Sequence, residues 1–147
     1  DPRAEVGPRL SLGHGAPLRA LSLSDPALLA RREAAFAGFL AVGQGTRDPV
    51  AEAQAWSDLS PRVSLEWLGG WLSDLIRLHA DAGVAYLGNP DKREALTPLA
   101  CRLGIAAGHR YLQRVMQARA TQDNPLNPQL LHESLLIDWA QLARKVS

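Results

Sequence analysis

The chain is poor in several residue types, and each scarcity excludes a class of protein. The single cysteine, Cys101, excludes an intramolecular disulfide framework and suits a reducing compartment. The 3 isoleucines and 3 threonines stand against 25 leucines and 23 alanines, which favours helices because strands select β-branched side chains. The apolar runs are too short to span a bilayer, and no signal peptide heads the chain. We therefore expect an all-α, soluble, cytoplasmic protein with no membrane partner.

The motifs of common catalytic and metal sites are also missing from the sequence. There is no Gly-x-x-x-x-Gly-Lys-Ser/Thr phosphate loop and no Gly-x-Ser-x-Gly nucleophile elbow. The four histidines, His14, His79, His109 and His132, do not have the spacing of metal ligands. Cys101 lies in the largely apolar segment Leu99-Ala-Cys-Arg-Leu103, so we expect it to be a small buried side chain. We expect no catalytic residue, no metal ligand and no cofactor.

Helix starts are marked clearly, because a capping side chain precedes a proline at five places. With 147 residues the chain has about the length of one domain. We interpret residues 1–24 as the end of one domain and 25–147 as an independent helical bundle. The five pairs are Asp25-Pro26, Asp48-Pro49, Ser60-Pro61, Asn89-Pro90 and Asn127-Pro128. The helices are expected near 16–23, 26–42, 48–58, 61–81, 90–103 with a break at Thr97-Pro98, 105–121 and 128–144.

The helix expected over 61–81 has apolar residues over about half of its circumference. That width predicts a central helix that packs against two neighbours. We assign its two tryptophans, Trp67 and Trp71, to packing. The alternative is that one of them lies at a subunit boundary, where tryptophan is enriched.

The segment Gly15-Ala-Pro-Leu-Arg-Ala-Leu21 resembles the start of the lid helix of AAA+ clamp-loader ATPases, which reads Gly-Ser-x-Arg-Asp-Ala-Leu. In that family the arginine reaches the γ-phosphate in the site of the preceding domain. Leu18 stands at its position here, and Arg19 follows one residue late, a rotation of about 100° around the helix. The degenerate motif of Gly15, Leu18 and Arg19 therefore implies a subunit that does not hydrolyse ATP.

Two later segments resemble helices of one such subunit, delta-prime of bacterial DNA polymerase III. They are Leu65 to His79, which is similar to a long helix of its C-terminal domain, and Asn127 to Trp139, which is similar to its last helix. The resemblance implies a helical bundle of the clamp-loader collar, preceded by a remnant of the AAA+ lid. It also implies a non-catalytic scaffold that assembles with the delta and gamma/tau subunits. The sliding clamp and primed DNA would be partners only indirectly, through the assembly.

The last expected helix is apolar nearly all round, which is unusual for a helix on the surface of a monomer. Either it is buried in its own bundle or one side contacts a neighbouring subunit. The resemblance favours the second interpretation, and we place Leu130, Leu136 and Ile137 at the interface. The stripe expected to face the core consists of Leu131, Leu135, Trp139 and Leu142.

Between Ala95 and Gln122 the sequence has no acidic residue, and its cations lie between Arg102 and Arg119. One alternative is therefore a free-standing helical domain that binds nucleic acid, or regulates, through this basic face. A solvated face or a charged rim of a subunit contact is the favoured interpretation, because no aromatic residues interleave as single-strand binders require. The basic residues are Arg102, His109, Arg110, Arg114 and Arg119.

Overall fold

The computed structural model describes residues 25–121 and 127–145, and all of its regular structure is helical, which confirms the all-α prediction. The chain divides into two compact units, residues 1–37 and 38–147, and the boundary falls within α3. The lid-like segment with Gly15, Leu18 and Arg19 lies outside the described residues. The helices are α3 (Pro26–Gln44), α4 (Pro49–Ala55), α5 (Pro61–Ala80), the short 3-10 helix η1 (Pro90–Lys92), α6 (Arg93–Arg102), α7 (Ile105–Ala120) and α8 (Pro128–Lys145).

Three of the five expected caps form through the side chain. Asp25 and Asp48 each accept a hydrogen bond of 2.9 Å from a backbone N–H of the first turn, and Asn127 accepts one of 3.2 Å. These bonds satisfy amides that have no partner within the helix. Ser60 makes no side-chain cap, and Asn89 points its amide elsewhere, to a carboxylate described below. The dipeptides therefore located the helix starts correctly, but the expected capping bond forms at only three of the five.

The expected break at Thr97-Pro98 is wrong, because α6 continues through Pro98. The Thr97 hydroxyl donates a hydrogen bond of 2.7 Å to the Arg93 carbonyl oxygen. Pro98 and Glu94 are both exposed, so the Glu94 carbonyl, which loses its helical N–H partner, faces water. The irregularity lies one turn earlier, where η1 leads into α6 at Arg93.

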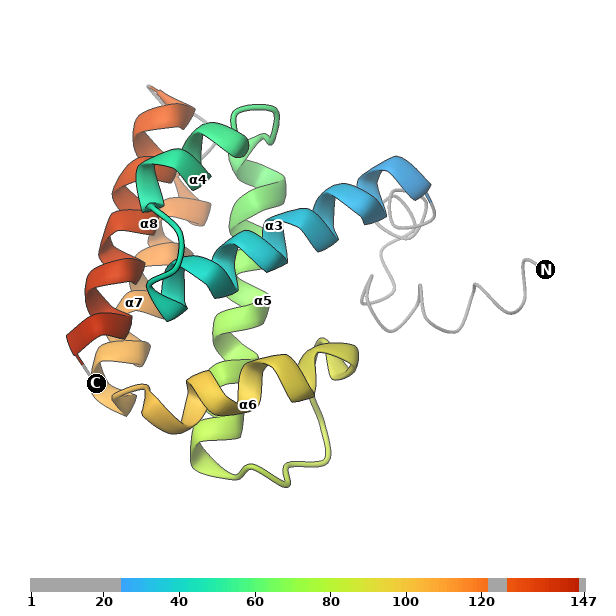
Figure 1. Cartoon of the computed structure of the whole chain (residues 1–147), viewed down its shortest axis with the longest axis vertical. Helices are drawn as coiled ribbons and strands as arrows, with labels where there is room; N and C mark the ends of the chain where they lie inside the picture. The colour runs from blue at the N-terminus through green and yellow to red at the C-terminus, as the bar shows by residue number, and fades with distance from the viewer. Residues whose placement is uncertain (1–24, 122–126, 146–147) are drawn as a thin grey trace. The chain divides into compact units, whose positions relative to one another are not determined.

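Helix α5 is the central helix of the unit formed by residues 38–147, as its width of apolar surface predicts (Figure 1). It packs against both α6 and α7, and α8 packs against α4 and α7. His79 Nδ1 lies 2.8 Å from the Ala100 carbonyl oxygen and ties α5 to α6. The core face of α5 consists of Leu65, Leu68, Trp71, Leu72 and Leu75, all fully buried.

The last turns of α3 approach α4 closely at Gly38. Glu52 is buried, and its carboxylate accepts hydrogen bonds from Trp56 Nε1 at 2.7 Å and from Arg47 Nε at 2.8 Å. A Cβ atom on Gly38 would lie 1.7 Å from Glu52 Oε2. Only a residue without a side chain lets α3 approach this buried carboxylate so closely.

Candidate subunit interface

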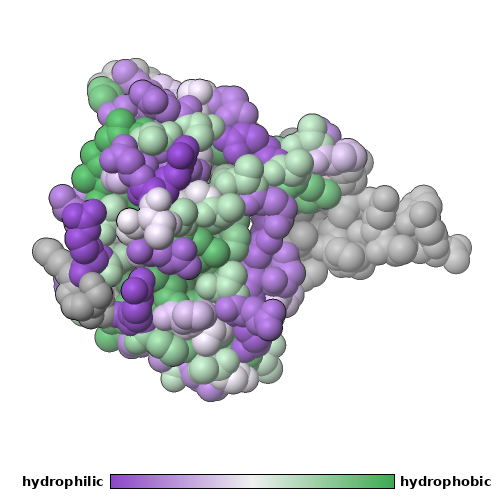
Figure 2. Space-filling view, viewed as in Figure 1, coloured by the Kyte–Doolittle hydropathy of each residue, from purple (hydrophilic) through white to green (hydrophobic). Residues whose placement is uncertain are grey.

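The outer face of α8 leaves apolar surface uncovered. Leu130 is 60% exposed and Ile137 is half-buried, so both side chains are available to a partner. Leu136, expected beside them, is fully buried in the chain itself. We therefore correct its assignment: a helix turns by about 100° per residue, and this rotation carries Leu136 from the outer face into the core. Figure 2 shows hydrophobic surface along the edge where α8 begins.

The inner face of α8 holds the bundle together. Trp139 is fully buried, stacks on Phe39 with ring centroids 4.5 Å apart, and lies 5.9 Å from the Tyr111 ring. Its indole Nε1 donates a hydrogen bond of 3.0 Å to the Phe39 carbonyl oxygen. Leu135 is also buried, so the core prediction is confirmed for Leu135 and Trp139. Leu131 and Leu142, predicted in the same stripe, are only half-buried.

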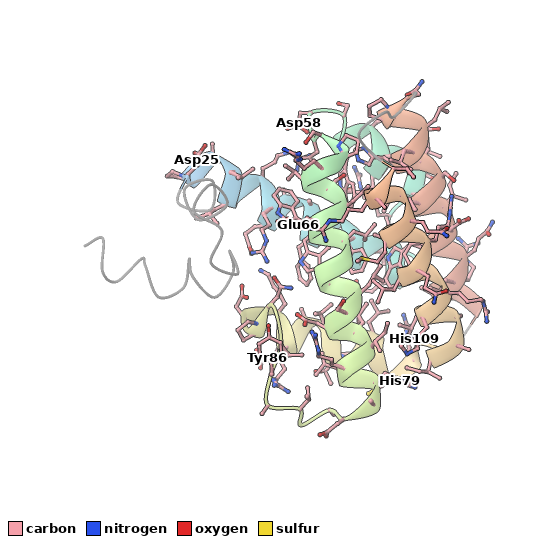
Figure 3. The ribbon with its side chains drawn as sticks, turned by 180° about the vertical axis from the view of Figure 1, so that it is seen from behind. Asp25, Asp58, Glu66, His79, Tyr86 and His109 are labelled. Carbon is pink, nitrogen blue, oxygen red and sulfur yellow. The ribbon has the colours of Figure 1, made fainter. Side chains whose placement is uncertain are left out.

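Three of the five basic residues between Arg102 and Arg119 are engaged within the chain. Arg114 forms an ion pair with Asp138 and donates to the Ser134 hydroxyl at 2.6 Å. Arg119 pairs with Glu66 at 3.4 Å, and Arg102 donates to a backbone carbonyl oxygen at the end of α3, also at 3.4 Å. The carboxylates paired with Arg114 and Arg119 reduce the positive potential available to a phosphate backbone. His109 (Figure 3) is exposed on α7, and the next residue, Arg110, is exposed as well.

A buried serine and histidine meet where α5 and α8 approach each other. Ser64 Oγ and His132 Nε2 lie 2.7 Å apart, and both residues are almost fully buried. The His132 ring packs edge-on against Trp56, with centroids 5.5 Å apart. Its Nδ1 atom is buried and has no hydrogen-bond partner among the described residues. Burial in this apolar setting lowers the pKa of His132 to about 4.

The lowered pKa of His132 predicts an acid-sensitive fold. Below an unfolded-state pKa of about 6.5 the unfolded chain binds a proton that the folded chain does not accept until about pH 4. The stability is therefore complete above pH 6.5 and falls as the pH drops towards 4, by about 3 kcal/mol. We expect His132→Gln to lose this dependence. Urea unfolding of both proteins at pH 7 and pH 4 measures it, and equal pH dependence of the two would contradict the assignment.

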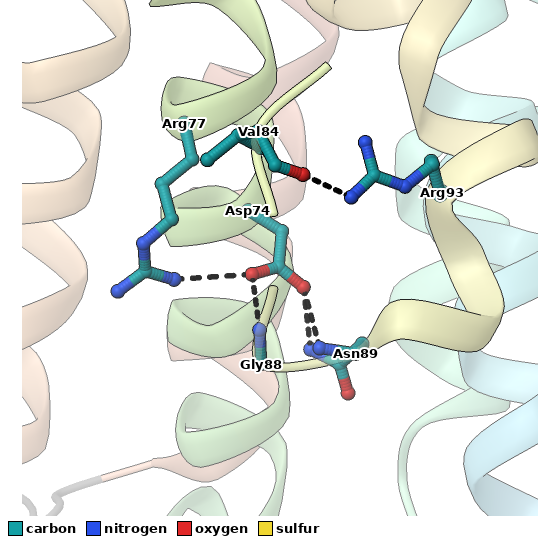
Figure 4. Close-up of polar contacts among 6 residues, drawn as sticks. All are labelled: Asp74, Arg77, Val84, Gly88, Asn89 and Arg93. Atoms are coloured by element: carbon teal, nitrogen blue, oxygen red, sulfur yellow. Dashed lines mark hydrogen bonds and ion pairs between the residues drawn. The ribbon is translucent and has the colours of Figure 1, made fainter. Parts of the chain in front are cut away.

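Asp74 forms a polar cluster that the sequence analysis missed. Its carboxylate is fully buried: Oδ1 accepts from the Gly88 N–H at 2.8 Å and from Arg77 Nη1 at 3.1 Å (Figure 4). Oδ2 accepts from the Asn89 backbone N–H at 2.7 Å and from Asn89 Nδ2 at 3.1 Å. The signal that could have revealed it is an acidic residue within the buried stripe of α5, because a buried carboxylate needs several donors.

The described residues contain no candidate metal centre. Across 25–121 and 127–145, no group of three or more histidine, cysteine, aspartate or glutamate residues is placed to hold a metal ion. Cys101 is exposed, which corrects the expectation that it is buried. It lies on the outer side of α6, whereas its neighbour Ala100 is fully buried. No described helix is both long and apolar enough to cross a membrane.

Comparison with known proteins places the chain in a family. Residues 26–141 match the family described as DNA polymerase III, delta subunit, C terminal. The description names delta, whereas the resemblance noted in the sequence was to delta-prime, so the match supports the clamp-loader assignment and not the choice of subunit. No curated protein and no solved structure matches the chain. Because the match covers most of the 147 residues, the chain belongs to the family of the C-terminal domain of the DNA polymerase III delta subunit.

Proposed function

We propose that this chain is a non-catalytic scaffold domain of a DNA polymerase III clamp loader. In this proposal residues 25–147 form a collar domain, preceded by a remnant of an AAA+ lid in residues 1–24. The domain assembles with other clamp-loader subunits, such as delta and gamma/tau, in the cytoplasm. The assembly then loads the sliding clamp onto primed DNA. The contribution of such a domain is buried area between subunits, since it supplies no chemistry of its own.

The exposed apolar side chain of Leu130, on the same face of α8 as half-buried Ile137 two turns later, is the observation that carries the proposal. The opposite face of α8 is already used in the core through Leu135, Leu136 and Trp139. A helix that buries one face and leaves an apolar side chain exposed on the other offers that side chain to a partner subunit. The family match covers α8 as far as residue 141.

We assign the subunit as delta-prime on the degenerate motif of Gly15, Leu18 and Arg19, and delta is the competing assignment. The two are distinguished by reconstitution of the clamp loader with one subunit omitted at a time. A delta-prime domain enters assemblies that lack delta-prime and not those that lack delta. The reverse pattern would assign the chain to delta.

Substitutions on the outer face of α8 test the proposed interface. We expect Leu130→Asp and Ile137→Asp to leave the isolated domain folded, because both positions reach water when no partner is bound. In the assembly the new charge is buried without a partner, which should weaken incorporation at least tenfold. Size-exclusion chromatography of the reconstituted loader measures incorporation, and thermal melts check folding.

Two controls make the result specific. Gln54→Asp places the same charge on an exposed position of α4 and should incorporate normally. Leu136→Asp places it in the core and should unfold the isolated domain. Normal incorporation of both Leu130→Asp and Ile137→Asp would refute the interface.

The alternative function, a nucleic-acid-binding or regulatory domain that uses the face from Arg102 to Arg119, predicts a different result. It requires salt-dependent binding of a duplex oligonucleotide by the isolated chain. Arg110→Gln should weaken that binding, because Arg110 is an exposed cation of this face. The ion pairs of Arg114 and Arg119 within the chain favour the scaffold instead.

A further inference from the structure

The loop between α5 and α6, residues 81–89, is held in place along its length. Asp74 binds its last two residues, as described above, and Arg93 donates to the carbonyl oxygens of Ala82, at 2.9 Å, and of Val84 (Figure 4). Leu87 is only 3% exposed and anchors the loop in the core. A loop with this many fixed points loses little conformational entropy when it binds a partner.

The Tyr86 side chain projects into solvent from this loop. It is 57% exposed, although its neighbour Leu87 is buried, and Figure 3 shows it at the surface of the loop. The guanidinium of Arg77 lies over the ring, 5.2 Å from its centroid. Tyrosine and arginine are the residue types enriched at the centres of protein interfaces. The contact with Arg77 also restricts the ring, so that the pair is arranged before any partner binds.

Arg77 retains donors for a second acceptor. Its side chain is 42% exposed, and Nη1 is bonded to Asp74. Within the described part of the chain its other guanidinium nitrogens bond to no carboxylate or carbonyl oxygen. A carboxylate can therefore bind these nitrogens while the Arg77 side chain stays fixed by Asp74 and Tyr86.

The surrounding charges select the kind of partner. Asp81, Asp91 and Glu94 are exposed at the two ends of the loop. Asp91 is paired with Lys92 at 3.5 Å, whereas Asp81 and Glu94 add negative charge that disfavours the continuous charge of a nucleic-acid backbone. The acceptor that suits Arg77 is therefore a single carboxylate bound directly by its guanidinium. A protein surface with one acidic residue beside an apolar one fits this pattern.

We propose that Tyr86 and Arg77 form a preorganised recognition site for a neighbouring clamp-loader subunit, which presents an apolar side chain to the Tyr86 ring and a carboxylate to Arg77. This second contact rests on the proposed function and lies apart from the α8 interface. Asp74 is its positioning residue, because it fixes the loop and Arg77 together.

Incorporation of full-chain variants into the reconstituted loader tests this site. Tyr86→Ala should weaken incorporation at least tenfold without lowering the melting temperature, since the ring is exposed in the isolated chain. Tyr86→Phe keeps the ring and should remain within twofold of the parent. Arg77→Gln should weaken incorporation and also make it less dependent on salt concentration, because an ion pair is lost.

The outcomes separate this inference from the proposed function. If Leu130→Asp blocks incorporation and Tyr86→Ala does not, the Tyr86 site is wrong and the scaffold function stands. If the parent chain itself does not enter the assembly, both the Tyr86 site and the scaffold function are wrong. If Tyr86→Ala instead weakens binding of a single-stranded oligonucleotide and leaves incorporation unchanged, the site belongs to nucleic acid and the inference is overturned.

Discussion

Replacing Trp139 with alanine is expected to lower the free energy of unfolding by about 3–5 kcal/mol. The side chain is fully buried, and its ring lies against both Phe39 and Tyr111. Its truncation removes this burial and leaves a cavity that the stacked rings cannot fill. It also leaves the Phe39 carbonyl oxygen without the indole N–H donor. Urea unfolding followed by circular dichroism measures the change.

The matched control for Trp139→Ala is Trp139→Phe, which keeps an aromatic ring but loses the hydrogen bond. We expect it to be less destabilising than the alanine variant, by about 2 kcal/mol or more, because most of the burial is retained. Equal losses in the two variants would show that the hydrogen bond, and not the packing of the ring, dominates at this position.

Replacing Asp74 with alanine should have a similar effect, about 3–5 kcal/mol, for an electrostatic reason. The substitution removes the acceptor of the Gly88 N–H and of both Asn89 donors, and it leaves Arg77 without its ion pair. Asn89 is buried, so its donors cannot turn to water. Urea unfolding again measures the loss.

Hydrogen exchange gives a second measurement for Asp74 that a general loss of packing would not mimic. The backbone amides of Gly88 and Asn89 should exchange much faster in Asp74→Ala than in the parent, relative to amides of α7. Asp74→Asn retains one acceptor oxygen and should fall between the two. Unchanged protection at Gly88 and Asn89 would contradict the role assigned to the carboxylate.

Much of the fold follows from local features of the sequence. The proline pairs located the starts of α3, α4, α5 and α8 to within a residue, because a capping side chain and a fixed proline φ act within one turn. The width of apolar surface on α5 identified it as the central helix, since periodicity shows how much of a helix is covered. The exception, Pro98, was misjudged because the sequence does not show that Glu94 and Pro98 face water in α6.

The residues of the candidate interface were harder to predict from the sequence. The apolar stripes on α8 correctly placed Leu135 and Trp139 in the core, but not Leu136. Whether Leu136 is buried depends on how much of the α8 surface is covered by α4 and α7. The basic residues between Arg102 and Arg119 looked like one continuous face in the sequence. Only the tertiary structure shows that Arg114 and Arg119 are paired with Asp138 and Glu66, which are distant in the sequence.

The sequence by itself determined the helical class, the starts of α3, α4, α5 and α8 and the clamp-loader resemblance, because these depend on residue type and on spacing within one helix. The tertiary structure decided which apolar residues remain uncovered and which charges are paired. It also decided that Asp74 on α5 binds the loop before α6. These properties depend on contacts between residues far apart in the chain, and such contacts form only when the helices pack together.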